Sequence, residues 1–298
     1  MTPYFIAFEL MIYLLFGLCL IHAWRGGAAV VWRLVAGVLF GILLEYGTIR
    51  QLQAYSYGRF MIMLGDVPLP VGVAWSCIVY SARLFSEGSG LPAWARPLLS
   101  ALFALNIDLS MDAIAIRLGF WHWSIDIHSQ FFGVPYGNFW AWFWVVFSFT
   151  AGLRLILSWK HPLGSWLAPL GAMLGGVLVV LLTNRLLVSI STFSYSLYVL
   201  LVTLVLAGAL LLVVVLRQRN GGGYGTEAKF RVSMDLPATM VPLSFHAFFL
   251  VAGTISGIYF QVPTLLAVSL LMAAIGVYLH RDVLQLKGAI RIFSSKEH

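Results

Sequence analysis

The stretch 104-ALNIDLSMDAIAI-116 decides how this chain folds, because it places two aspartates inside an otherwise apolar segment of membrane-spanning length. Asp108 and Asp112 are four residues apart, so a helix puts both on one face. An ionised side chain near the bilayer centre costs about 2.5 to 3.5 kcal/mol on insertion scales, which disfavours a pair that faces lipid. We therefore expect both carboxyls to face an internal cavity, and we look for the function around them.

The composition of the whole chain agrees with a membrane location. Of its 298 residues 61% are hydrophobic and only 10% are charged, and the mean hydropathy is +0.92. These values predict an all-α polytopic membrane protein, a bundle of about eight or nine transmembrane helices that forms a single domain over residues 1–298. Runs of about 20 apolar residues lie at 4–24, 30–49, 69–87, 97–118, 137–158, 166–185, 193–216, 239–259 and 262–280.

The ends of these runs carry further signals. Glu9 interrupts the first run, which has no basic start and no small-residue cleavage pattern, so we expect a retained helix rather than a signal peptide. A glycine-rich polar stretch at about 217–235 is the linker between the seventh and eighth spans. The two cysteines, Cys19 and Cys77, both lie in apolar runs, which favours packing roles over a disulfide or a metal site.

The basic residues predict the orientation. If the N-terminus is outside, 14 of the 18 lysines and arginines fall on the cytoplasmic side. This agrees with the positive-inside rule, by which short cytoplasmic loops carry an excess of basic residues. The four that fall outside are Arg50, Arg59, Arg117 and Arg185. We expect an integral protein of a prokaryotic cytoplasmic membrane, whose net charge of +7 faces anionic lipid rather than nucleic acid.

This orientation brings several polar residues to one depth. Glu45 lies near the outer end of the second span, Asp108 and Asp112 in the outer half of the fourth, and Asn138 at the outer start of the fifth. The two longest outer loops, about 49–68 and 118–136, are rich in aromatic residues. Aromatic residues at an interface often form only a belt. Carboxyls, an amide and aromatic rings at one depth together indicate a binding site.

A family resemblance rests on these residues. The motifs are Glu45-Tyr-Gly, Tyr55-Ser-Tyr57-Gly, Leu64-Gly-Asp-Val-Pro-Leu-Pro and Trp75, then Asp108-Leu-Ser-Met-Asp112, Trp121-His-Trp123 and Phe132-Gly-Val-Pro135-Tyr-Gly-Asn138-Phe-Trp-Ala-Trp142. In order and spacing they resemble the carotenoid 1,2-hydratase family of integral membrane proteins, which includes bacterial carotenoid 1′-hydratases and archaeal bisanhydrobacterioruberin hydratase. The resemblance covers roughly residues 40–145.

The chain departs from the family pattern at two positions. The family usually has Asp-Pro where this chain has Asp112-Ala113, and it usually has glycine where this chain has Ala141. Without the proline ring we expect the fourth helix to be straighter at that point. Alanine in place of glycine adds a methyl group, which limits how closely a neighbouring helix can approach at this position.

The resemblance implies that water is added across the terminal C1–C2 double bond of an acyclic carotenoid end group, a hydro-lyase type of reaction without a cofactor. The partners that it implies are an acyclic carotenoid or a related long isoprenoid, water and membrane lipid. Such a hydration needs a strong acid for C2, a short-lived tertiary cation at C1 and one held water. Two neighbouring carboxyls in apolar surroundings suit the acid, because one of them keeps its proton.

The candidate roles follow from this chemistry. Asp112, at the family's Asp-Pro position, is the preferred acid, and Asp108 is the other possibility. Glu45, or the second aspartate, stabilises positive charge or orients water. Asn138 can hold water by donating and accepting together. Aromatic faces stabilise a cation, and the candidates for this role are Tyr55, Tyr57, Trp121 and Trp123. The motif residue Trp142 is a further candidate for binding substrate or water.

Other interpretations stay open. Asp108 could pair with Arg117, Glu45 could reach the interface, and Asn138 could be a helix N-cap. His122, Asp126 and His128 fit no established metal spacing, so we expect no metal site. A carotenoid-binding or assembly subunit would use the same aromatic cavity without an acid. A transporter is less favoured, since no internal repeat is visible.

Overall fold

Apolar helices of membrane-crossing length dominate the computed structural model, which describes residues 2–161, 163–219 and 236–281. In chain order the long helices are α1 (Pro3–Arg25), α2 (Ala28–Leu52), α3 (Leu69–Glu87), α4 (Arg96–Arg117), α5 (Tyr136–Leu157), α6 (Gly164–Phe193), α7 (Tyr195–Arg219), α9 (Leu236–Ile255) and α11 (Pro263–Leu279). Within the described ranges eight helices can cross a membrane by length and composition, and α11 is a shorter apolar helix. The all-α polytopic bundle is confirmed. Of the expected linker, 220–235 lies outside the described residues.

Local sequence explains most of the helix boundaries. Proline stands in the first turn of α1, α3, α4 and α11, where its missing N–H costs no helical hydrogen bond. Gly27 separates α1 from α2 with a φ of +88°, a conformation open to glycine. The helix α4 continues through Ala113 without interruption, as the absence of proline predicts. The expected end of α6 at 185 is wrong, because the helix continues to Phe193.

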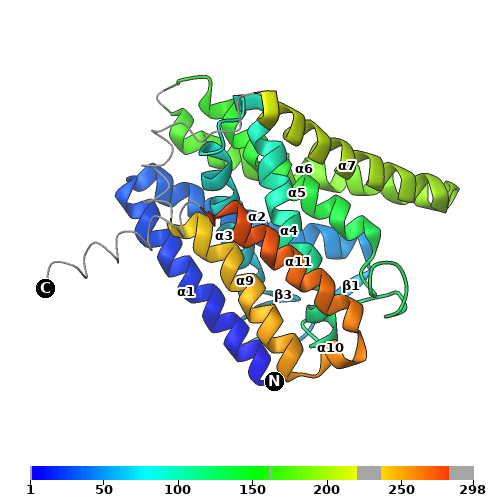
Figure 1. The fold of residues 1–298 in the computed structure, drawn as a ribbon. Coiled ribbons are helices and arrows are strands. Elements are labelled where there is room, and N and C mark those ends of the chain that lie inside the picture. The colour runs from blue at the N-terminus through cyan, green and yellow to red at the C-terminus, as the bar shows by residue number, and fades with distance from the viewer. Residues whose placement is uncertain (1, 162, 220–235, 282–298) are drawn as a thin grey trace, which may run out of the picture.

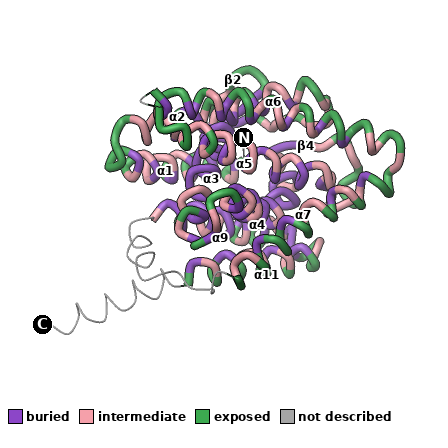
Figure 2. Tube along the Cα trace, turned by 90° about the horizontal axis from the view of Figure 1, so that it is seen from above, coloured by how far each residue is buried: buried purple, intermediate pink, exposed green. Residues whose placement is uncertain are grey.

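The helices pack around α3 and α4, most of whose residues are buried. On one side α1, α9 and α11 lie next to each other, and on the other α5 and α6 pack together, with α2 against both α3 and α6 (Figure 1). Viewed from above, buried residues concentrate at the centre, and exposed residues follow the outer helices (Figure 2). The exposed residues of the outer helices are largely leucine and valine, which suits contact with lipid.

A short β-ribbon joins the two aromatic segments that the sequence predicts as loops. Strand β1 (Tyr55–Tyr57) pairs antiparallel with β4 (Trp121–Trp123), and Tyr55 is opposite Trp123 while Tyr57 is opposite Trp121. Opposed residues share one face of a ribbon, so the four rings point to the same side. A second pair, β2 (Met63–Leu64) and β3 (Val67–Pro68), leads into α3. We call this end of the bundle, with residues 53–68 and 118–135, the ribbon end.

A buried carboxyl in α1 holds the ribbon end in place. Glu9 accepts hydrogen bonds from the backbone N–H of Met61 at 2.8 Å and of Ile62 at 3.2 Å, and from the Tyr13 hydroxyl at 2.7 Å. Nearby, Phe5 packs edge-on against Phe120, with ring centroids 4.7 Å apart, and also contacts Phe60. Glu9 therefore has partners that explain its burial.

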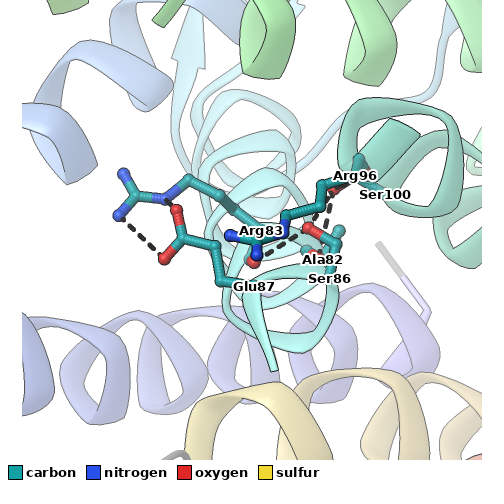
Figure 3. A network of polar contacts seen from close by, with 6 residues as sticks. All are labelled: Ala82, Arg83, Ser86, Glu87, Arg96 and Ser100. Carbon is teal, nitrogen blue, oxygen red and sulfur yellow. Dashed lines mark hydrogen bonds and ion pairs between the residues drawn. The ribbon is translucent and has the colours of Figure 1, made fainter. Parts of the chain in front are cut away.

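The opposite end, which we call the basic end, has a polar network of its own between α3 and α4 (Figure 3). Arg83 forms an ion pair with Glu87 at 3.0 Å, and the Arg96 Nε donates to the Leu91 carbonyl at 2.9 Å. Between the two helices the Ser100 hydroxyl donates to Ser86 Oγ at 2.8 Å. These contacts hold the α3–α4 turn in place, and we use the name basic end for this turn and its flanking residues, 83–100.

Candidate functional site

A cavity of about 420 Å³ lies under the β1–β4 ribbon, and its wall includes residues of α1 to α7 and α9. Eight of the nine candidate residues from the sequence line it, and Asp108 lies directly behind the wall. The eight are Glu45, Tyr55, Tyr57, Asp112, Trp121, Trp123, Asn138 and Trp142. The structure thus brings together residues from three helices and two loops.

The Glu45 carboxyl is held by three donors. Its Oε2 accepts from the hydroxyls of Tyr55 at 2.6 Å and Tyr57 at 2.7 Å, and its Oε1 accepts from Trp75 Nε1 at 2.8 Å. Thr48 Oγ1 lies 2.6 Å from the Tyr55 hydroxyl and supports that ring from α2. A group that accepts at both oxygens has the hydrogen-bonding pattern of a carboxylate. Glu45 is therefore an internal acid with a defined orientation and does not reach out to the interface.

Asn138 bridges the two aspartates. Its Nδ2 lies 2.6 Å from Asp112 Oδ2 and 3.1 Å from Asp108 Oδ2. Asp108 is 0% exposed and Asp112 is 3% exposed, so both carboxyls are buried inside the bundle. Two carboxyls that share one amide nitrogen in this way are close enough to interact strongly.

The two tyrosines of β1 keep their protons. Burial, and then the neighbouring Glu45 carboxylate, raise the pKa of Tyr55 and the pKa of Tyr57 well above the ordinary value of about 10. Both hydroxyls therefore remain donors to Glu45 over the whole physiological pH range.

Aromatic rings form most of the remaining wall. Trp75 and Trp142 pack with centroids 4.4 Å apart, and Tyr55 packs on Trp123 at 4.8 Å. Tyr57 meets Trp121 edge-on at 6.0 Å. The carboxyls and the π faces thus share one cavity, an arrangement that can stabilise a cationic centre.

The cavity reaches the outer surface of the bundle along α6 and α7. Val188 and Tyr195 are part of the lining and are 39% and 56% exposed. The buried residues Val180 and Leu187 of α6 continue the same wall inward. The cavity is therefore open to the outside of the bundle between α6 and α7.

Several alternative interpretations are resolved by these contacts. Arg117 does not pair with Asp108, because its guanidinium donates to the carbonyls of Ala113 and Phe132, each at 2.8 Å. Asn138 is not an N-cap, since α5 begins at Tyr136 and the cap position is Pro135.

The potential metal ligands of the ribbon end are not gathered into one site. His122 and His128 are exposed, and Asp126 Oδ1 accepts from the His128 backbone N–H at 2.7 Å. Over the described ranges no group of three or more His, Cys, Asp or Glu side chains could hold a metal ion.

Sequence reasoning missed several polar residues of the site, and three of them are described here. Thr48 supports Tyr55, the Tyr198 hydroxyl accepts from the Gly137 backbone N–H at 2.5 Å, and Asn184 lines the cavity from α6. The signal for Asn184 was an amide in an apolar helix, but the neighbouring Arg185 made that position resemble the end of the span.

Comparisons with known proteins complete the description of the site. Neither the search of curated proteins nor that of solved structures found a match. A family model described as carotenoid biosynthesis protein matches residues 2–215, which extends the similarity well beyond 40–145. The match covers more than half of the chain and includes nearly every residue of the cavity wall. The chain therefore belongs to the carotenoid biosynthesis protein family.

Proposed function

We propose that this protein is a cofactor-independent hydratase that adds water across the terminal C1–C2 double bond of an acyclic carotenoid end group. The observation that carries the proposal is the carboxyl of Asp112 in the wall of a largely aromatic and apolar cavity, linked through Asn138 to a second buried carboxyl. Family membership supports a carotenoid-related substrate.

The acid of the reaction is Asp112. It lines the cavity, whereas Asp108 contacts Asn138 from behind the wall. Two buried carboxyls on one amide nitrogen cannot both ionise cheaply, so the pair retains one proton. Asp112 delivers this proton to C2, the π electrons form the new C–H bond, and a tertiary cation is left at C1.

Water then completes the reaction. Its oxygen attacks C1, and one of its protons returns to the ionised aspartate pair, so that the acid is regenerated and the net change is the addition of one water. The amide nitrogen of Asn138 is occupied by the carboxyls, which leaves its Oδ1 to orient this water. Glu45 and the faces of Trp121 and Tyr57 stabilise the cation.

The single-sided cavity also bears on the alternatives. Its lining comes from the parts of the helices nearest the ribbon end, while the polar network of the basic end has separate residues. A transporter needs access from both faces. A pigment-binding subunit would retain a carotenoid in this cavity without changing its mass.

The test is expression in cells that make lycopene, followed by mass analysis of the extracted pigments. We expect a product heavier by one water from the natural chain. Asp112→Asn keeps the side-chain volume but cannot protonate an alkene, so the yield should fall by about 10²- to 10⁴-fold or more. Bound but unaltered pigment in the natural chain would support the pigment-binding alternative instead.

The matched control is Asp126→Asn. Asp126 is an exposed aspartate of the ribbon end outside the cavity lining, so the same chemical change should leave the yield unchanged. Protein level in the membrane is measured for each variant, which separates loss of chemistry from loss of folding. Equal yields from the Asp112→Asn and natural chains would mean that Asp112 is not the acid.

A further inference from the structure

Four arginines from four different helices gather beside the basic end. They are Arg33 of α2, Arg83 of α3, Arg96 of α4 and Arg154 of α5, and we call them the arginine cluster. Arg33 interacts electrostatically with Arg83, and Arg154 interacts with both Arg83 and Arg96, so like charges lie close together. In the part of the chain that the structure describes, Glu87 is the carboxylate that interacts with them, and it forms an ion pair with Arg83 at 3.0 Å (Figure 3).

The cluster carries more positive charge than this carboxylate can balance. Four guanidinium groups and one carboxylate add up to a charge of +3. All four arginines are partly buried, and Arg33 Nε is a buried donor without a partner among the described residues. Like charges repel more strongly when they are partly removed from water, and a buried donor without an acceptor costs free energy. An anion with several acceptor oxygens, bound between these helices, reduces both costs.

The positive-inside rule alone does not explain this arrangement. That rule concerns basic residues of the loops and helix ends, and it accounts for exposed residues such as Arg25 and Lys160. In contrast, Arg33, Arg83 and Arg154 lie within their helices. The helices that carry the cluster pack in sequence order, α2 against α3, α3 against α4 and α4 against α5. The guanidinium groups are therefore held together by the packed bundle, as a defined binding site requires.

Exposed tryptophans mark the depth of the cluster in the membrane. Because successive spans alternate in direction, the end of α1, the start of α4, the end of α5 and the start of α6 lie on the same side of the bundle. Tryptophans that are 50% to 76% exposed lie at or just beyond these four ends, namely Trp24, Trp94, Trp159 and Trp166. Tryptophan is enriched at the level of lipid headgroups. Arg96 and Arg154 are close in sequence to two of these rings, so the cluster lies at the level of lipid phosphates.

We propose that the arginine cluster binds the headgroup of an anionic phospholipid and prefers a headgroup with two phosphates. Guanidinium groups bind phosphate oxygens through paired N–H donors. One phosphodiester carries one negative charge and leaves most of the cluster's charge unbalanced, whereas the two of cardiolipin balance most of it. Basic pockets between membrane helices bind headgroups of this kind. The site is separate from the cavity, and the proposal does not depend on the hydratase activity.

Lipid titration followed by native mass spectrometry tests the proposal. The full chain in neutral detergent is titrated with cardiolipin, phosphatidylglycerol or phosphatidylethanolamine, and bound lipid is counted from the mass. We expect cardiolipin to bind most tightly and phosphatidylethanolamine least tightly. Inorganic pyrophosphate also has two phosphates, but it lacks the acyl chains that would contact exposed apolar residues such as Leu155, so it should bind more weakly than cardiolipin.

Variants locate the site. Arg33→Gln and Arg154→Gln each remove one charge and should weaken cardiolipin binding about 5-fold, as expected for one basic residue near an anionic headgroup. Glu87→Gln removes the opposing charge and should tighten binding, a gain that damage to the fold does not produce. The matched control is Arg25→Gln, because Arg25 is an exposed arginine outside the cluster, and its affinity should stay unchanged. Size-exclusion profiles confirm that each variant is folded.

Several results would overturn the proposal. Equal affinities for the three lipids would exclude a headgroup site, and phosphatidylglycerol as tight as cardiolipin would exclude the preference for two phosphates. Pyrophosphate bound as tightly as cardiolipin would mean that the site takes a soluble anion. Unchanged binding in Arg33→Gln and Arg154→Gln, an equal loss in Arg25→Gln, or weaker binding in Glu87→Gln would exclude the cluster. No carotenoid enters these measurements, so their outcome is distinct from that of the hydratase test.

Discussion

Asp108 and Asp112 share a helix face but differ in what they can touch. Asp112 is part of the cavity wall, and Asp108 lies behind it against Asn138. Asp108 is thus a positioning residue in the proposed chemistry, because it acts through Asn138 and the shared proton. The spacing of the two aspartates alone cannot make this distinction, since it depends on which side of α4 meets α5.

Trp121 offers a measurable aromatic contribution. Trp121→Leu keeps apolar bulk and removes the π face, so the hydration rate should fall by about 30-fold, the equivalent of the roughly 2 kcal/mol of a desolvated cation–π contact. The measurement is product yield per unit of membrane protein. Trp144→Leu is the control, because Trp144 lies on α5 outside the cavity lining. A similar loss in both variants would assign the effect to packing.

The sequence predicted which residues line the cavity better than it predicted the hydrogen-bond partners of those residues. Intramembrane acids are costly, so Glu45 and Asp112 stood out and both line the cavity. The donors around Glu45 come from α3 and β1, which are brought to it only by tertiary packing. The Asn184 amide faces inward for the same reason, and composition could not show its direction.

Among the structural elements, the β1–β4 ribbon closes the cavity with few hydrogen bonds. At one end the Ser124 N–H donates to Ala54 at 2.8 Å, and at the other the Gly58 N–H donates to Phe120 at 2.9 Å. Ser124→Pro removes the first donor and should loosen the cover over Glu45. We expect at least a tenfold loss of product yield with little change in protein level.

The control for the ribbon prediction is Ser124→Ala, which keeps the backbone N–H and should retain the yield. Solvent access can be followed directly by quenching of tryptophan emission with iodide, because Trp121 and Trp123 belong to β4. Full activity and unchanged quenching in Ser124→Pro would mean that the ribbon is not needed to close the site.

A second polar network joins α4, α9 and α11 outside the cavity lining. His246 Nδ1 lies 2.9 Å from Ser110 Oγ, and its Nε2 lies 3.0 Å from Asn106 Oδ1. Asn106 Nδ2 in turn donates to the Met272 carbonyl at 3.1 Å. The Ser110 hydroxyl also donates to the Ile107 carbonyl at 2.9 Å, so the network connects the ring with the backbone of α4.

His246→Leu should therefore destabilise the bundle without changing the chemistry. Interhelical hydrogen bonds in membranes contribute about 0.6 kcal/mol on average and up to about 1.7 kcal/mol, so we expect a loss in that range. Denaturant unfolding in mixed micelles measures it, and product yield per folded protein should stay constant. A selective loss of yield at constant stability would instead connect His246 with the reaction.

The helices were largely predictable because a span of about 20 apolar residues has few alternatives in a bilayer. The expected and observed bounds of α3 are both 69–87. The end of α6 was missed because nothing breaks the helix at Asn184, whereas Ser194 has extended backbone with a φ of −156°. The strands were missed because each has two or three residues, and β1 pairs with β4 across a long separation in sequence.

For the molecule as a whole, the two ends predict an orientation in the membrane. The basic end contains Arg83 and Arg96, and the ribbon end contains the cover of the cavity. By the positive-inside rule we expect the ribbon end outside. Single cysteines at the exposed positions Ser56 and Ala93, in a background without Cys19 and Cys77, should react differently with an impermeant maleimide in intact cells.

Ser56→Cys should label in intact cells, and Ala93→Cys should label only after the membrane is opened. Both native cysteines are buried and neither forms a disulfide, so replacing them removes no covalent link from the fold. The reverse pattern would place the cavity near the cytoplasmic face, and the carotenoid would then have to approach through the inner leaflet.

The length of α6 has a consequence for how a ligand is exchanged. Its 30 residues extend about 45 Å, against a hydrocarbon thickness of about 30 Å, so a helix that stayed within the bilayer would lean by roughly 45° to 50°. The α6–α7 hairpin reaches beyond the rest of the bundle (Figure 1), and its exposed leucines suit contact with acyl chains. A polyene lying among those chains would meet a slanted track towards the acids. Substrate capture then becomes lateral diffusion within one leaflet and needs no extraction of the pigment into water.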